Sequence, residues 1–62
     1  MHTVLVVEDE PVIRLGAVAI VEDAGFAVVE AADATEAIRI LEARTDIRLI
    51  LTDVDMPGQW TV

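Results

Sequence analysis

The chain has 62 residues, of which 12 are acidic and four are basic, and its net charge is −8 at pH 7. This length allows one domain with a small core, because a chain of about 60 residues buries only about 60% of its unfolded surface. The absence of cysteine excludes disulfides, and the acidic charge argues against nucleic-acid binding. No apolar run reaches the roughly 20 residues of a membrane span, and no signal-peptide pattern is present. We therefore expect a cytoplasmic protein that binds neither nucleic acid nor membrane.

The first two predicted elements are a strand over residues 3–7 and a helix over about residues 11–24. The strand is a valine-rich run that ends in a cluster of acids. Pro11 suits the first turn of a helix, and Gly25 is placed to end that helix in the left-handed conformation. Apolar residues at helical spacing predict the helix face that meets the core. They are Ile13, Ala17, Ile20 and Ala24.

Three further apolar residues of this helix lie off the predicted inner stripe and form a small outward patch. They are Leu15, Val18 and Ala19. The patch is a candidate dimer contact, although isolated surface hydrophobes are common and often carry no function. Trp60, near the end of the sequence, also fits interface packing, with a solvated tail as the alternative.

The remaining predicted elements are a strand over residues 27–31, a helix over residues 34–44 and a strand over about residues 48–53. Asp33 with Glu36 three residues later is typical of a capping box at a helix start. The inner face of this helix is predicted to consist of Ala37, Ile38 and Leu41. Apolar strands that alternate with helices predict an α/β fold with a parallel sheet covered on both faces.

The topology predicts where the acidic residues meet. If the first strand lies between the second and third, in the order 2-1-3, the carboxyl ends of the first and third strands are neighbours about 4.8 Å apart. Glu8, Asp9 and Asp53 would then gather at one edge. Carboxylates held together favour a raised pKa or a bound cation, and Mg²⁺ suits an open acidic pocket. The alternative is that these acids cap strand ends and stay solvated.

A small enzyme that uses these carboxylates as general acid and base is a weaker interpretation. No histidine, serine or cysteine accompanies the acids at the predicted edge. His2 is the only histidine, and we expect it to be a solvated terminal residue.

Two segments of the sequence carry a family resemblance. Residues 6–11 (VVEDEP) and 51–58 (LTDVDMPG) resemble the two signature segments of response-regulator receiver domains. Residues 24–26 and 31–37 resemble the family at the expected spacings. The resemblance implies the βαβαβ half of a flavodoxin-like doubly wound parallel sheet, carried by residues 1–62.

The resemblance also implies a role for each acid at the predicted edge. Asp53 corresponds to the phosphoacceptor and Asp9 to a direct Mg²⁺ ligand, while Glu8 corresponds to an acid that acts through water. Asp55 corresponds to a ligand through its backbone carbonyl. The implied partner is a sensor histidine kinase or a phosphotransfer protein, and the implied activity is at most self-phosphorylation and dephosphorylation at Asp53 rather than an enzyme's turnover.

The sequence departs from the family after the third strand. A complete receiver is roughly twice as long, and its fourth and fifth strands carry a hydroxyl residue and a lysine that contact the phosphoryl group. This sequence contains no lysine, and residues 59–62 do not match the family pattern. We therefore expect an open edge on the third strand and a homodimer formed through that edge or through the first helix. The alternative function is a phosphotransfer-inactive fragment that serves only as a dimerising structural unit.

Overall fold

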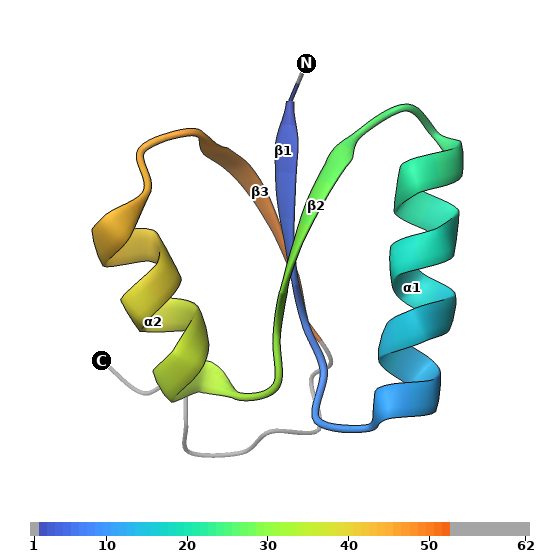
Figure 1. Cartoon of the computed structure of the whole chain (residues 1–62), viewed down its shortest axis with the longest axis horizontal. Helices are drawn as coiled ribbons and strands as arrows, with labels where there is room; N and C mark the ends of the chain where they lie inside the picture. Colours follow the sequence, from blue (N-terminus) through green and yellow to red (C-terminus); the bar gives the residue numbers. More distant parts are fainter. Residues whose placement is uncertain (1, 53–62) are drawn as a thin grey trace.

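Three parallel strands form one sheet in the computed structural model, which describes residues 2–52. The elements in chain order are β1 (Thr3–Val7), α1 (Pro11–Asp23), β2 (Ala27–Ala31), α2 (Ala34–Ala43) and β3 (Ile47–Thr52). The sheet has the order β2-β1-β3, which confirms the predicted α/β class and strand order. Figure 1 shows α1 and α2 on opposite sides of the sheet.

β1 is the central strand, and its side chains alternate between two small cores. The core on the α2 side consists of Leu5, Val7, Ala31 and Ala37. The core on the α1 side consists of Val4, Val6 and Val18. All five residues of β1 are buried, so the valine-rich strand supplies most of the apolar material in both layers.

α1 turns a different face to the sheet from the one that its spacing predicts. Val18 is only 9% exposed, and Ala17 and Val21 pack beside it against β1 and β2. Ile20, assigned to the inner stripe, is 72% exposed. Ile13 and Ala24 are exposed as well, so the predicted stripe is wrong except at Ala17. Most positions in the first three turns of α1 are apolar, and the pattern therefore contains several possible stripes.

The face that α1 turns to the sheet also changes which residues belong to the predicted outward patch. Val18 packs with Val4 and Val6 and cannot be a surface contact, so its assignment to an interface is wrong. Leu15 and Ala19 are exposed. Trp60, the fourth predicted interface residue, lies outside the described residues. Two residues of the predicted patch thus remain accessible on α1.

Both helices have an identifiable terminal hydrogen bond. Gly25 follows α1 with a φ of 97°, its N–H donates to Glu22 and the N–H of Phe26 donates to Val21 at 3.3 Å, which is the Schellman motif. At the start of α2 the Asp33 carboxylate accepts from the N–H of Glu36 at 2.8 Å. The predicted left-handed glycine and the predicted cap are both confirmed.

The capping box of α2 differs from the usual pattern in its return bond. The Glu36 carboxylate accepts from the N–H of Ala32 at 2.9 Å, one residue before the cap. The inner face of α2 also differs from the prediction at one position. Ile38 is exposed, and Ile40 packs against the core with Leu41 in its place.

An ion pair and a hydrogen bond fix the turn before β3, at the amino edge of the sheet. The Arg44 guanidinium donates to both carboxylate oxygens of Asp46, at 2.9 and 2.6 Å. These bonds hold the pKa of Asp46 below its ordinary value. The Thr3 hydroxyl donates to the same carboxylate at 3.4 Å, so the turn is joined to the start of β1. Because both charges are exposed, we expect the pair to define the turn more than to stabilise the fold.

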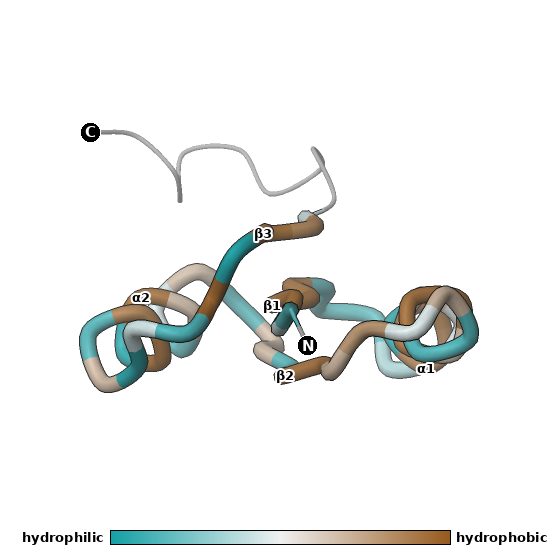
Figure 2. Tube along the Cα trace, turned by 90° about the horizontal axis from the view of Figure 1, so that it is seen from above, coloured by the Kyte–Doolittle hydropathy of each residue, from teal (hydrophilic) through white to brown (hydrophobic). Residues whose placement is uncertain are grey.

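β3 is one of the two edge strands, and its residues are the least covered of the sheet. Figure 2 shows both helices beside β1 and β2, while β3 stands apart from them. Leu49, Ile50 and Leu51 are all exposed although they are apolar. Within residues 2–52 no strand pairs with the outer edge of β3. An apolar groove of about 170 Å³ lies between β3 and α1, and its walls include Leu49, Leu51 and Ile20.

Candidate functional site

The three strands end level with one another at the carboxyl edge of the sheet. Val7, the last residue of β1, pairs with Ala31 on one side and with Thr52 on the other. Beyond the strands, the N–H of Glu8 donates to the carbonyl of Ala31 at 3.1 Å. The residues that follow β1 therefore begin between the ends of its two neighbours, where open α/β sheets bind their ligands.

Glu8 is a buried acid at this edge, and its polar groups are held by hydrogen bonds. The residue is 5% exposed. Its carboxylate accepts from the N–H of Glu10 at 3.1 Å, and its backbone carbonyl accepts from the guanidinium of Arg14 at 2.8 Å. Burial of a polar group costs free energy unless it is hydrogen-bonded, so these bonds make the buried position of Glu8 tenable. Asp9, the next residue, is exposed.

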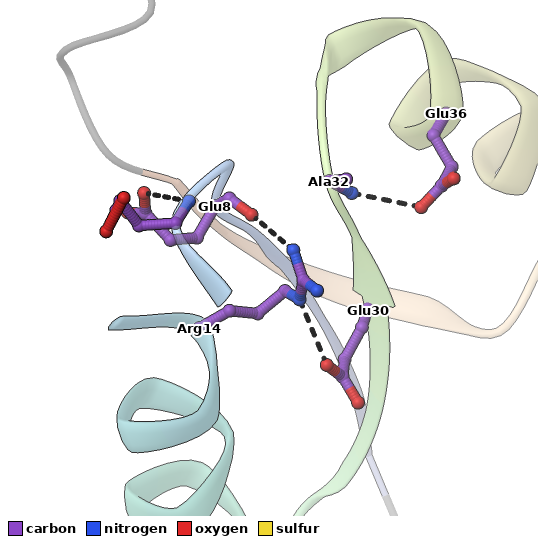
Figure 3. A network of polar contacts seen from close by, with 6 residues as sticks. Glu8, Arg14, Glu30, Ala32 and Glu36 are labelled. Atoms are coloured by element: carbon purple, nitrogen blue, oxygen red, sulfur yellow. Dashed lines mark hydrogen bonds and ion pairs between the residues drawn. The ribbon is translucent and has the colours of Figure 1, made fainter. Parts of the chain in front are cut away.

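Arg14 joins three elements around Glu8. It lies in the first turn of α1, and its Nε donates to the carboxylate of Glu30 on β2 at 3.2 Å. Its other arm holds the Glu8 carbonyl at the end of β1 (Figure 3). Sequence reasoning did not single out Arg14. The available signal was that it is the first basic residue after the acidic run at residues 8–10 and follows Glu10 by four positions, one turn of a helix.

A family model and the site geometry point to the same class of protein. The model of the response regulator receiver domain matches residues 4–60. The chain belongs to the receiver domain family. Receiver domains are signalling modules of two-component systems, and this receiver is therefore assigned to that class. The matched range includes all four acids that the sequence predicts at the site, and it extends to residue 60, so the expected departure from the family at residues 59–62 is wrong for residues 59 and 60.

Two known proteins show how this receiver relates to longer chains. It is 41% identical over 56 residues to a protein named sensor kinase CckA of Brucella abortus (strain 2308), covering 89% of this chain and 6% of that protein. It superposes on the crystal structure of a response regulator receiver protein from Pseudomonas putida with a TM-score of 0.82 and 33% identity. That match covers 92% of this chain and 47% of the solved chain. The receiver thus spans less than half of either relative.

The structure locates two of the four predicted metal ligands. Glu8 and Asp9 lie side by side in the chain at the carboxyl edge, as the topology predicts. Asp53 and Asp55 lie outside the described residues. Among residues 2–52, no three histidine, cysteine, aspartate or glutamate side chains come together in a way that would hold a metal ion. In the same range, neither helix is long and apolar enough to cross a membrane.

Proposed function

We propose that this receiver accepts a phosphoryl group on Asp53 at the carboxyl edge of its sheet. The observation that carries the proposal is the register of β3 on β1, in which Thr52 pairs with Val7. Asp53 follows Thr52 in the sequence, just as Glu8 follows Val7, and consecutive Cα atoms are about 3.8 Å apart. The register therefore supports a site where Asp53 meets the acids that follow β1.

Mg²⁺ is the metal that the residues of this edge suit. The exposed Asp9 offers a hard oxygen ligand, and Glu8 places a second carboxylate beside it. Asp53 through its side chain and Asp55 through its backbone carbonyl complete the proposed set. Mg²⁺ is commonly held by one or two carboxylates together with phosphate oxygens and waters. When bound, it would neutralise charge shared by the attacking and transferred oxygens.

The phosphoryl donor is proposed to be a phosphohistidine of a sensor histidine kinase or phosphotransfer protein. A carboxylate oxygen of Asp53 forms a bond to phosphorus, and the bond between phosphorus and the imidazole nitrogen breaks. The imidazole leaves with the electron pair and takes up a proton, and the product is an aspartyl phosphate. The similarity to a protein named as a sensor kinase supports a partner of this class. Activity of the chain itself is limited to gain and loss of this group.

A small-molecule phosphodonor tests the chemistry without the kinase. We expect the intact mass of the wild-type chain to increase by one phosphoryl group in the presence of Mg²⁺. The same reaction with a chelator should give little or no adduct, because the acids of the edge then repel the donor. Equal yields with and without Mg²⁺ would contradict the metal site. No adduct under any condition would favour a phosphotransfer-inactive unit.

We also propose that the receiver self-associates through the outer edge of β3 or through α1. The support is an apolar strand whose outer edge has no partner strand among residues 2–52, together with the exposed Leu15 and Ala19 on α1. Unpaired strand edges are templates for pairing with another chain. Burial of Leu49, Ile50 and Leu51 against a second copy would remove apolar surface from water.

Sedimentation of two matched variants tests the β3 edge. We expect Ile50→Lys to shift the wild-type dimer toward monomer, because a charge on β3 opposes the pairing of two copies. Ile38→Lys is the control, since Ile38 is 47% exposed and Ile50 is 42% exposed, but Ile38 lies on α2. A monomeric wild-type chain at micromolar concentration would overturn the association. An equal effect of both substitutions would move the contact away from β3.

A further inference from the structure

We infer that Arg14 is a positioning residue that fixes the turn carrying Glu8 and Asp9 for a divalent cation. The inference deepens the proposed function and rests on its magnesium site. Arg14 has no assigned part in that site, and among residues 2–52 its side chain contacts no atom that is proposed as a metal ligand. Its two hydrogen bonds reach the backbone carbonyl of Glu8 and the carboxylate of Glu30.

The bond to the Glu8 carbonyl acts on Asp9 through the peptide that the two residues share. A peptide unit is planar, so the direction of the Glu8 carbonyl also sets the direction in which the chain enters Asp9. The guanidinium holds this carbonyl at 2.8 Å. The N–H of Glu8 is held separately by Ala31 at 3.1 Å. The peptide groups on both sides of Glu8 are thus fixed, and the backbone position from which the Asp9 side chain extends is fixed with them.

Glu30 makes the guanidinium itself a fixed group. Its carboxylate accepts from Nε at 3.2 Å, while a different nitrogen of the same planar group donates to Glu8. The Arg14 side chain is 22% exposed, against 53% for Glu30, so the arginine is largely packed between α1 and β2. Figure 3 shows the guanidinium between these two partners. The fork shape of arginine is needed to reach both at once.

The charge of Arg14 and its hydrogen bonds have opposite expected effects on the affinity for Mg²⁺. A positive group beside a cation site repels the cation, so a role through charge alone would weaken Mg²⁺ binding. Removal of that charge would then strengthen binding. A role through position predicts the reverse, because a loosened turn no longer presents Asp9. The two roles therefore differ in the sign of the effect.

Calorimetric titration with magnesium chloride of the wild-type chain, Arg14→Ala and Arg14→Lys separates the two roles. We expect both variants to bind Mg²⁺ about tenfold more weakly, since loss of groups that orient metal ligands commonly costs 10- to 100-fold in affinity. Lysine keeps the charge and loses the fork, so similar weakening in both variants identifies position as the cause. Arg39→Ala is the control for net charge, because Arg39 is exposed on α2 and has no polar partner among residues 2–52.

Three outcomes overturn the inference, and they are distinguishable from one another. Tighter binding in Arg14→Ala with wild-type binding in Arg14→Lys would assign Arg14 a role through charge alone. Equal binding in the wild-type chain and both variants would exclude any role at the metal. No saturable binding in the wild-type chain would remove the proposed magnesium site and this inference with it. Thermal unfolding with a chelator checks that each variant is folded. If Arg14→Ala does not fold, the Mg²⁺ affinity of Arg14→Lys alone tests the inference.

Discussion

Replacement of Asp53 by asparagine is expected to abolish phosphoryl incorporation from a small-molecule donor in the presence of Mg²⁺. Asparagine has nearly the shape of aspartate but is neutral, so it is a poor nucleophile toward phosphorus and a weaker metal ligand. Intact-mass measurement of wild-type and variant chains treated in parallel reads the result directly. The expected effect is complete, because no second residue of the proposed site has the role of acceptor.

Two further aspartates provide controls for this loss. Asp55→Asn should retain the adduct, since its proposed contribution is a backbone carbonyl that the substitution leaves in place. Asp46→Asn should also retain it, because Asp46 pairs with Arg44 at the opposite edge of the sheet. Persistence of the adduct in Asp53→Asn would show that another residue accepts the group and would overturn the proposed assignment.

Leu5→Ala is expected to unfold most of the protein. Leu5 is 0% exposed and lies at the centre of β1, where it packs in the core on the α2 side. A buried leucine truncated to alanine costs about 2–5 kcal/mol. Stabilities of about 0.05–0.15 kcal/mol per residue give a chain of this size little to lose, so one such change removes much of the free energy of unfolding. Urea denaturation followed by circular dichroism measures the loss.

The matched control is Ile20→Ala, which removes as many carbon atoms from an exposed position. Ile20 is 72% exposed at the groove between α1 and β3, so its truncation should change the free energy of unfolding by no more than about 0.5 kcal/mol. Similar losses in the two variants would mean that Ile20 is covered in solution. That outcome would indicate that a second copy of the chain covers the apolar groove between β3 and α1.

Local signals were sufficient to predict the ends of the elements, and the family resemblance supplied the order of the strands. Gly25 has a left-handed backbone conformation that would strain any residue with a side chain. A glycine that follows an apolar helical run signals such a position. Asp33 caps α2 through its own neighbouring residues. Right-handed crossovers alone also allow the order 1-2-3, so it was the family resemblance that selected the order 2-1-3.

The orientation of α1 could not be predicted from spacing. Val18 and Ile20 are both apolar and lie on different sides of the helix, and only the fit against β1 selects between them. At α2 the choice between Ile38 and Ile40 was likewise made by packing. Small residues such as Ala17 allow close approach to the sheet, which a count of apolar positions does not reveal.

The candidate site was predictable where its residues follow a strand. Glu8 and Asp9 come directly after β1, so the end of this strand alone brings them to the carboxyl edge. Arg14 was not predictable in this way, because its contacts to Glu8 and Glu30 depend on how α1 sits against β2. The roles of Asp53 and Asp55 remain predictions that the proposed experiments address.

The central position of β1 has a consequence for synthesis of the chain. β1 is made first, but its partners β2 and β3 are made later, and β3 is the last of the described strands. Until β2 and β3 have been made, β1 is an unpaired valine-rich segment of the nascent chain, and such segments are prone to aggregate. Glu8, Asp9 and Glu10 follow this segment directly. Repulsion between these acids on neighbouring nascent chains would oppose aggregation of β1, so the acids of the proposed site would also serve the protein during its synthesis.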